Sequence, residues 1–259
     1  MKALITGASS GLGADMARIL YKKGYDLILV ARRKERLESL KAELCKNADI
    51  KTISDIKIIP MDISGDKNAA DLYEKVKNED INILINNAGF GLFGEFANCD
   101  TDREMEMVDL NIKTLHVLTK LFLRDFKKKN KGLILNVASS AGLMPAGPLL
   151  STYYATKSYV TSLTLAIAEE LRREKSKVKI SALCPGPFDT EFNSVAGVSF
   201  SIKGLDSKYV ADYGIKNMFK GKKIIIPGLL MKLANFAKRL VPTSVTVAGA
   251  YNIQKKKGR

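Results

Sequence analysis

The chain contains no tryptophan, one histidine and three cysteines among its 259 residues. The cysteines, Cys45, Cys99 and Cys184, are far apart and match no paired metal-ligand spacing. Their number and spacing argue against a disulfide framework and a zinc site, so no metal is expected and a reducing compartment fits. The single histidine, His116, lies within an apolar helical pattern, and we assign it no chemistry.

Acidic residues are also scarce, with 27 against 42 basic ones and a formal net charge of +15. Because the lysines are dispersed and no aromatic residues alternate with them, we interpret them as a solvated surface and expect no nucleic-acid partner. The first apolar run begins at residue 2, which predicts no signal peptide and a cytoplasmic location. The uncharged stretch 132–156 contains Pro145 and Pro148, which favour strand and loop over a membrane span.

Apolar runs rich in β-branched residues alternate with amphipathic helical stretches along the chain, which is typical of parallel βαβ units. We expect an α/β fold of Rossmann type, doubly wound, with a mostly parallel seven-stranded sheet and helices on both faces. Residues 1–259 are expected to form a single domain, with a substrate cap at about 188–220 and a C-terminal amphipathic helix at about 229–240. The predicted strands are 2–6, 26–31, 56–60, 81–85, 132–138, 178–183 and 223–226.

The stretch "TGASSGLG" (6–13) lies between the first strand and the first helix. A helix start offers unpaired N–H groups and a positive dipole end, and the glycines let a phosphate approach them closely. A nucleoside-triphosphate loop would require Lys and then Ser or Thr after the last glycine, whereas Ala14 and Asp15 follow here. A dinucleotide is therefore the expected ligand, although the spacing is not G-x-G-x-x-G.

The end of the second strand indicates which dinucleotide binds. An NAD enzyme of this architecture keeps an acid there for the ribose 2′-hydroxyl, whereas an NADP enzyme has arginine. Asp26 lies at the start of that strand, about 15 Å from its tip, and Arg32 and Arg33 occupy the tip. Two guanidinium groups can bind a 2′-phosphate, so we expect NADP(H) in preference to NAD(H).

Five further motifs follow in order: "NNAG" (86–89), "DLN" ending at Asn111, "NVASSAG" (136–142), "YYATK" (153–157) and "PGPFDT" (185–190). Together with "TGASSGLG" they resemble the compact, single-domain branch of the short-chain dehydrogenase/reductase family over nearly the whole chain. The resemblance implies a catalytic tetrad of Asn111, Ser139, Tyr153 and Lys157. Tyr153 and Lys157 stand four residues apart, so one helix face presents both, and we expect Lys157 and an oxidised nicotinamide to lower the pKa of Tyr153.

In that resemblance Tyr153 exchanges a proton with the substrate oxygen, the serine hydroxyl binds that oxygen, and Asn111 holds a relay water beside Lys157. The position of the serine relative to "AG" selects Ser139, whereas counting thirteen residues back from Tyr153 selects Ser140. We choose Ser139, because the strand end fixes the register better than the loop. The expected cofactor-binding residues are Gly7, Ser9, Ser10, Gly11, Leu12, Gly13, Arg32, Arg33, Asp62, Ile63, Asn87, Ala88, Gly89, Tyr153, Lys157, Pro185, Gly186 and Thr190.

The substrate is expected to be an apolar carbonyl or alcohol compound, because Leu149, Leu150, Phe188 and Phe192 flank the predicted site. By family resemblance the apolar faces of 101–128 and 151–175 predict a homodimer or homotetramer. A dinucleotide sensor without chemistry is the alternative function, which the presence of Tyr153 and Lys157 disfavours. The basic amphipathic segment 227–242 could lie on an anionic membrane, but packing on its own core, over the pocket or on a partner subunit is favoured.

Overall fold

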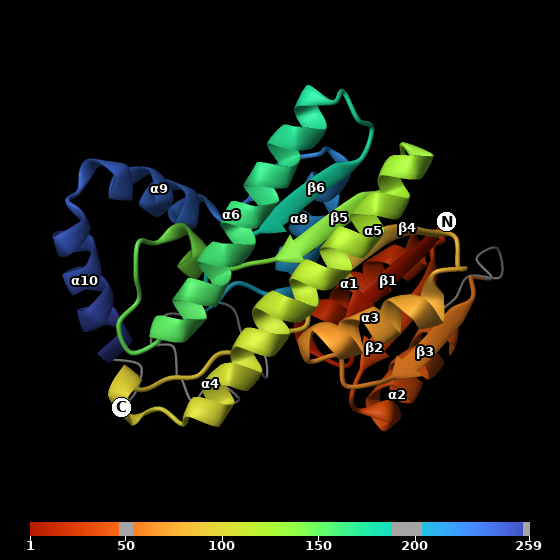
Figure 1. The fold of residues 1–259 in the computed structure, drawn as a ribbon, viewed down its shortest axis with the longest axis horizontal. Coiled ribbons are helices and arrows are strands. Elements are labelled where there is room, and N and C mark those ends of the chain that lie inside the picture. The colour runs from red at the N-terminus through yellow and green to blue at the C-terminus, as the bar shows by residue number, and fades with distance from the viewer. Residues whose placement is uncertain (47–53, 188–203, 256–259) are drawn as a thin grey trace.

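The structure, a computed structural model, describes residues 1–46, 54–187 and 204–255. Within these residues the chain forms one seven-stranded sheet in which every neighbouring pair of strands is parallel, in the order β3-β2-β1-β4-β5-β6-β7 (Figure 1). This confirms the predicted fold class. The strands are β1 (Lys2–Thr6), β2 (Asp26–Ala31), β3 (Ile56–Pro60), β4 (Ile81–Asn86), β5 (Leu133–Val137), β6 (Lys179–Leu183) and β7 (Ile224–Ile225).

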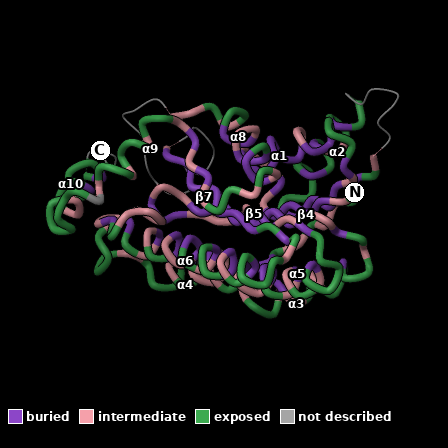
Figure 2. Tube along the Cα trace, turned by 90° about the horizontal axis from the view of Figure 1, so that it is seen from above, coloured by how far each residue is buried: buried purple, intermediate pink, exposed green. Residues whose placement is uncertain are grey.

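Helices cover both faces of the sheet (Figure 2). One layer contains α1 (Gly11–Lys22), α2 (Lys34–Lys46) and α8 (Ser207–Phe219). The other contains α3 (Gly65–Val76), α5 (Leu115–Lys129) and α6 (Ser151–Arg173), with α4 (Thr101–Val108) against α6. A π-helical turn (Asp109–Thr114) joins α4 to α5, and 3₁₀ turns occur at Phe96–Asn98, Ser140–Leu143 and Lys238–Leu240. The chain continues into α9 (Leu229–Ala237) and α10 (Thr243–Lys255), which lie beyond the β7 end of the sheet.

Alternation along the strands explains the two layers. In β1, Ala3 and Ile5 belong to the core under α1, α2 and α8, whereas Leu4 belongs to the core under α3, α5 and α6. In β2, Leu27 and Leu29 face the first core, whereas Ile28 and Val30 face the second. Since helices cover both faces of the sheet, the side chains on both faces are buried. The strands therefore appear in the sequence as continuous apolar runs and not as alternating apolar and polar residues.

Two predicted segments can be compared with the helices. The expected amphipathic helix 229–240 corresponds to α9 and the 3₁₀ turn after it. Of the expected cap, 188–203 lies outside the described residues, and 207–219 forms α8. Val210 and Ile215 of α8 are fully buried against α1, so this part of the segment belongs to the core and not to a cap. None of the helices in the described ranges is both long and apolar enough to cross a membrane.

The strand order places the change of direction between β1 and β4. From β1 the sheet grows through β2 and β3 on one side and through β4 to β7 on the other. In open α/β sheets, ligands bind beyond the carboxyl ends of the strands at this switch point. The first residues after β1, β2, β4, β5 and β6 therefore converge on one region, and these are the residues of the predicted motifs.

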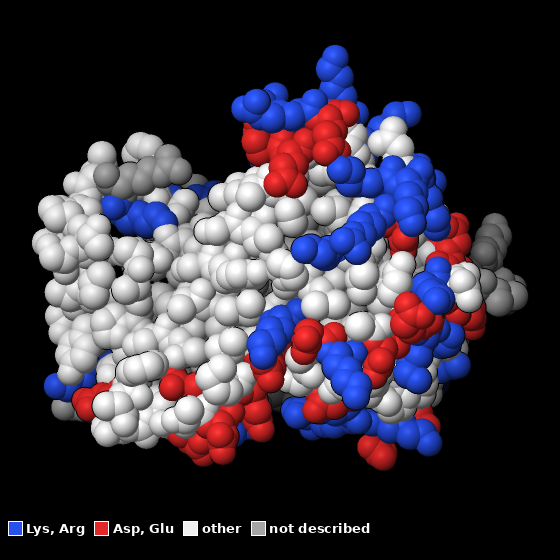
Figure 3. Space-filling view, in the orientation of Figure 1, with Lys and Arg blue, Asp and Glu red and all other residues white. Residues whose placement is uncertain are grey.

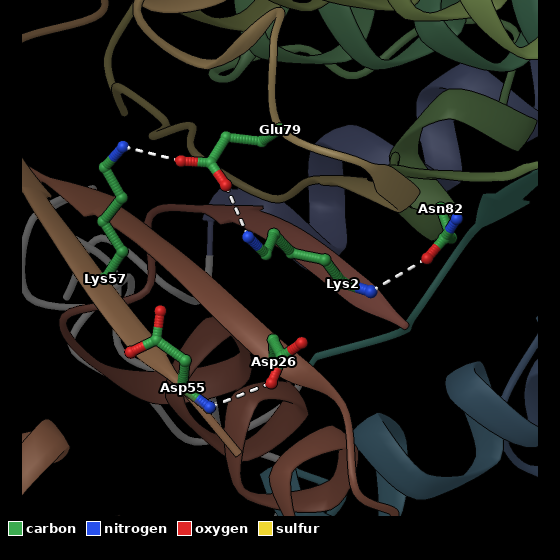
Figure 4. A network of polar contacts seen from close by, with 6 residues as sticks. All are labelled: Lys2, Asp26, Asp55, Lys57, Glu79 and Asn82. Atoms are coloured by element: carbon green, nitrogen blue, oxygen red, sulfur yellow. Dashed lines mark hydrogen bonds and ion pairs between the residues drawn. The ribbon is translucent and has the colours of Figure 1, made fainter.

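At the opposite edge of the sheet, polar side chains join the amino-terminal ends of the strands (Figure 4). Lys2 and Lys57 both contact the carboxylate of Glu79, the latter with Nζ 2.9 Å from Oε1. Asp26 Oδ1 accepts a hydrogen bond from the backbone N–H of Asp55 at 2.9 Å. The two lysine contacts lower the pKa of Glu79 from 4.5 to about 2. This network connects β1 and β3 to the residues just before β4.

We predict that Glu79→Gln lowers the free energy of unfolding by about 1 kcal/mol at pH 7, since the ion pairs are partly exposed. A depressed carboxyl pKa stabilises the fold above the unfolded value, so the contribution is present above pH 4.5 and is lost as the pH falls toward about 2. Urea unfolding at pH 7, 4.5 and 3 measures the difference. Glu74→Gln, at an exposed pair with Lys77 on α3, is the control. An equal Glu79→Gln deficit at pH 7 and pH 3 would contradict the assignment.

Candidate active site

The glycine turn after β1 is tied to the end of β4. Thr6 Oγ1 accepts hydrogen bonds from the backbone N–H groups of Asn87 and Ala88 at 3.0 and 3.1 Å. The Asn87 side-chain amide donates to the carbonyls of Thr6 and Gly7 at 3.0 and 3.1 Å. A Cβ on Gly13 would lie 2.4 Å from the Gly7 oxygen, so Gly13 permits close packing of α1 on the turn. Gly13 thus shapes the turn from behind, whereas Gly7 and Asn87 also face the cavity.

The start of α1 can hold an anion. Gly7 and Gly11 have positive φ values of 65° and 51°, which L side chains adopt at a cost. Ser10 is the N-cap residue, and its side chain makes no capping hydrogen bond, so the first N–H groups of the helix are not capped by it. These N–H groups point to the carboxyl end of the sheet together with the positive end of the helix dipole. The arrangement fits the pyrophosphate of a dinucleotide.

Arginine lies where the second strand ends. Arg32 and Arg33 are exposed and both line the cavity. Arg33 Nη2 donates to Ser10 Oγ at 2.9 Å and lies 3.4 Å from Ser9 Oγ, so the guanidinium sits directly beside the glycine turn. Asp26, by contrast, lies at the amino-terminal edge of the sheet in the network of Figure 4.

The end of β3 contributes the next part of the wall. Asp62 and Ile63 line the cavity, and Asp62 Oδ1 accepts a hydrogen bond from the backbone N–H of Ser64 at 3.0 Å. Asn86, at the end of β4, is buried and donates to Thr119 and Asn136. Asn86 therefore joins structural elements, and its neighbour Asn87 faces the ligand region.

Tyr153 and Lys157 lie in the first two turns of α6 and face the same cavity. Both are buried, and the Lys157 ammonium lies 5.8 Å from the centre of the Tyr153 ring. Lys157 Nζ donates a hydrogen bond to the Val137 carbonyl at the end of β5 at 3.0 Å. The helix and the strand end therefore hold the amine at the floor of the cavity.

Ser139 and Ser140 both follow β5, but their contacts differ. The Ser139 side chain is hydrogen-bonded to Tyr153 and also accepts from the backbone N–H of Ala141 at 3.1 Å. The backbone N–H of Ser140 donates to the Pro185 carbonyl at 2.7 Å. Both serines line the cavity, and Ser139 is the one that contacts the tyrosine.

Asn111 lies behind the cavity wall, in the π-helical turn between α4 and α5. Its amide nitrogen donates to the Phe90 carbonyl and to Thr156 Oγ1 at 2.9 and 3.1 Å, and its oxygen accepts from the Phe90 N–H at 3.1 Å. A Cβ on Gly89 would lie 2.7 Å from Asn111 Oδ1 and 3.4 Å from Lys157 Nζ. Asn111 and Lys157 therefore flank Gly89, and Asn111 does not itself line the cavity.

The pKa of Tyr153 is not lowered in the protein without a bound nicotinamide, whose positive charge belongs to that expectation. Burial raises the pKa of Tyr153 to about 12, and the hydrogen bond from Ser139 opposes that rise only in part. Burial also lowers the pKa of Lys157 to about 8. Both shifts follow from the same cause, because a low-dielectric environment disfavours the phenolate and the ammonium alike. The amine gives its hydrogen bond to Val137 and not to the phenol, so it does not compensate for burial.

The cavity has a volume of about 480 Å³ and connects the glycine turn to Tyr153. Leu150, Pro185 and Gly186 line it as expected, whereas Leu149 does not, and Thr190, Phe188 and Phe192 lie outside the described residues. His116 lies elsewhere, with Nδ1 2.6 Å from Tyr159 Oη. In the part of the chain that the structure describes, no cluster of His, Cys, Asp or Glu could hold a metal ion.

Several lining residues were not predicted from the sequence. They are Ala31, Met61, Ser64, Phe90, Arg103, Glu106, Leu110, Val137, Ala138, Ala141, Tyr154 and Gln254. Tyr154 could have been found as the neighbour of Tyr153 in "YYATK". Gln254 carries no local signal, because it is one hundred residues from Tyr154, whose hydroxyl accepts its Nε2–H at 2.6 Å.

Comparison with known proteins agrees with this geometry. The family model for short chain dehydrogenase matches residues 1–197. An uncharacterized oxidoreductase of Staphylococcus epidermidis is 32% identical over 214 residues, 81% of this chain and 87% of that protein. The 17-beta-hydroxysteroid dehydrogenase type 3 of Homo sapiens is 31% identical over 207 residues, 79% of this chain and 64% of that protein.

Among solved structures, a short-chain dehydrogenase from Sphingobium yanoikuyae in complex with NADPH superposes with a TM-score of 0.81. The identity is 27%, and the match covers 92% of this chain and 93% of that one. Strands β1 to β6, the glycine turn and the Tyr–Lys pair lie within the segment that matches the family model. The chain therefore belongs to the short-chain dehydrogenase family of oxidoreductases.

Proposed function

We propose that the chain is an NADP(H)-dependent oxidoreductase that interconverts a carbonyl compound and the corresponding secondary alcohol. The observation that carries this proposal is the contact of Ser139 with Tyr153, whose ring lies 5.8 Å from the Lys157 ammonium. The cavity around them continues to the start of α1, where the Ser10 side chain makes no capping hydrogen bond. When bound, the nicotinamide supplies or accepts the hydride at C4. Its pyrophosphate would lie on the N–H groups of the glycine turn.

Tyr153 is the proposed proton donor in the reductive direction. With a pKa of about 12 the phenol stays protonated at neutral pH, which is the state that a general acid needs. The Ser139 hydroxyl would hydrogen-bond the substrate oxygen and stabilise the negative charge that develops there. Lys157 would hold the nicotinamide ribose, and Asn111 would hold a relay water beside Lys157.

The proposed preference for NADP(H) rests on Arg32 and Arg33. Both arginines line the cavity, and the Arg33 guanidinium lies beside Ser9 and Ser10, where a 2′-phosphate would lie next to the glycine turn. The related structure from Sphingobium yanoikuyae holds NADPH. The remaining wall residues proposed for the cofactor are Gly7, Gly11, Leu12, Asp62, Ile63, Asn87, Ala88, Gly89, Pro185 and Gly186.

The proposed substrate is an apolar carbonyl compound, because Phe90, Leu110 and Leu150 line the cavity near the tyrosine. The 17-beta-hydroxysteroid dehydrogenase among the relatives acts on a substrate of this class by its name. A homo-oligomer is proposed through α5 and α6, where Leu165 is exposed on the outer side of α6. A cytoplasmic location is proposed because Cys45, Cys99 and Cys184 are unpaired.

NADPH oxidation measured against a panel of apolar ketones and aldehydes tests the activity. We predict that Tyr153→Phe lowers kcat about 10²- to 10⁴-fold, since proton transfer is lost, and leaves NADPH affinity within about threefold. Tyr154→Phe is the matched control, because it removes a hydroxyl that bonds to Gln254 at the same cavity. Undiminished turnover in Tyr153→Phe would contradict the proposed mechanism.

The two serines can be separated by the same assay. Ser139→Ala should lower kcat about 10- to 100-fold with little change in the KM for NADPH, because it removes a hydrogen bond to the reacting oxygen. Ser140→Ala should retain most of the turnover, since its backbone makes the contact with Pro185. A larger loss in Ser140→Ala would assign the role to the other serine.

The cofactor preference is tested with Arg33→Ala. We predict a rise of about 10- to 100-fold in the KM for NADPH and no such rise for NADH, because a charge-assisted contact with the 2′-phosphate is lost. Arg172→Ala removes the same charge at an exposed site on α6 and serves as the control. If wild-type protein uses NADH as well as NADPH, the proposed preference is wrong.

A further inference from the structure

The C-terminal arm, residues 229–255, exposes an unusual share of apolar surface. Fourteen large apolar residues are exposed in the described part of the chain, and nine of them lie in this arm. They are Leu229, Leu230, Leu233, Phe236, Leu240, Val241, Val245, Tyr251 and Ile253. Figures 1 and 2 both show the arm, α9 and α10, at the end of the molecule remote from β3 and α2.

The apolar side chains of α9 and the following turn form one outward stripe. Leu229, Leu233, Phe236 and Leu240 follow one another at spacings of four, three and four residues, so they share a helix face. Their exposed fractions are 58–77%, and no residue of α9 is buried. The apolar face therefore does not pack on the protein's own core, which was the first of the interpretations favoured from the sequence.

Met231, on the side of α9 opposite the stripe, and Lys232, at the margin of the stripe, hold the helix to the body. A Cβ on Gly186 would lie 2.9 Å from Met231 Cγ and Sδ, so Met231 rests against the backbone at the cavity wall. The Lys232 ammonium lies 5.2 Å from the centre of the Tyr213 ring of α8. These contacts come from residues outside the Leu229–Leu240 stripe, and they leave the stripe facing outward.

The C-terminal part of the chain contains basic residues and no acidic ones. After Asp212 the sequence contains eleven basic residues and no acidic one. Figure 3 shows the arm as a largely uncharged surface with basic groups at its upper and lower margins, the lower one next to acidic groups. An exposed apolar stripe with cationic margins matches a surface that is apolar inside and anionic at its boundary.

We propose that the C-terminal arm docks on an anionic lipid bilayer, with the stripe at the level of the acyl chains and the basic residues at the phosphate groups. A second copy of the chain fits less well. A two-fold interface would place the same cationic margins opposite each other without a carboxylate from the arm to neutralise them. An anionic bilayer supplies both the apolar layer and the negative charge.

The arm also reaches the candidate active site. Gln254, near the end of α10, lines the cavity and donates to Tyr154, and Met231 of α9 lies against Gly186 of the cavity wall. On the proposed function, an apolar carbonyl compound dissolved in the bilayer would meet the cavity from the docked side. Docking itself needs no catalysis and is tested without it.

Flotation of the full chain with phosphatidylcholine vesicles, with and without phosphatidylserine, tests the proposal. Wild-type protein should float with the anionic vesicles, and added salt should weaken the binding without abolishing it. The double variant Leu233→Glu/Phe236→Glu should bind at least about tenfold less, because two apolar side chains of the stripe are replaced by anions. Ala42→Glu, an exposed site on α2 at the opposite end of the molecule from the arm, is the control and should bind as wild type does.

Circular dichroism and urea unfolding of the three proteins show whether each is folded, and the exposed sites predict no difference. No binding to either vesicle, or equal loss in Ala42→Glu and the double variant, would overturn the proposal. Sedimentation velocity could also overturn it. If wild-type protein is an oligomer, only the double variant is a monomer and no vesicle binding is seen, then the stripe joins copies of the chain. None of these measurements depends on turnover, so a failure of the proposed reductase activity would be seen separately.

Discussion

The hydrogen bonds between the ends of β1 and β4 are the constraint on which the site depends. Thr6 and Asn87 join the glycine turn to the residues after β4 through four bonds of 3.0–3.1 Å, at the place where the sheet changes direction. The absence of a side chain at Gly13 lets α1 approach this junction. Since the start of α1 is thereby aimed at the region between the two strands, its first N–H groups, Arg33 and the start of α6 all face one volume.

Burial acts on the Tyr–Lys pair in opposite senses, and this decides what the pair can do. The same environment raises the pKa of Tyr153 and lowers that of Lys157, so the neutral form of each is favoured relative to water. The phenol is then a proton donor at neutral pH, and the Ser139 hydroxyl is the group that limits its shift. A phenol of this kind favours reduction of a carbonyl. Oxidation of an alcohol needs a phenolate, which requires further positive charge beside the ring.

The sequence predicted the sheet well because each strand is a continuous apolar run bounded by turn residues. Five of the predicted strands agree with the structure to within one residue of one end or better, whereas β7 keeps only Ile224–Ile225 of 223–226. The place of the segment that forms α8 was harder to predict, because a buried helix and a substrate cap can have the same apolar pattern in a sequence. The position of Gln254 at the cavity could not be predicted from the sequence, because it depends on how α10 packs against the start of α6. Motif spacing predicted where Tyr153 lies, but its pKa depends on burial, which spacing does not contain.

The outward stripe of α9 does not stabilise the folded monomer more than a polar face at the same positions would. Met231 on the opposite side and Lys232 at the margin of the stripe attach the helix, so the leucines and Phe236 remain in water at a free-energy cost. That cost is recovered only when another apolar phase covers the stripe. Because Gln254 places the same arm in the cavity wall, any surface that seats the stripe also fixes the position of α10 beside Tyr154. On this proposal, docking of the arm and the shape of the cavity depend on the same segment, residues 229–255.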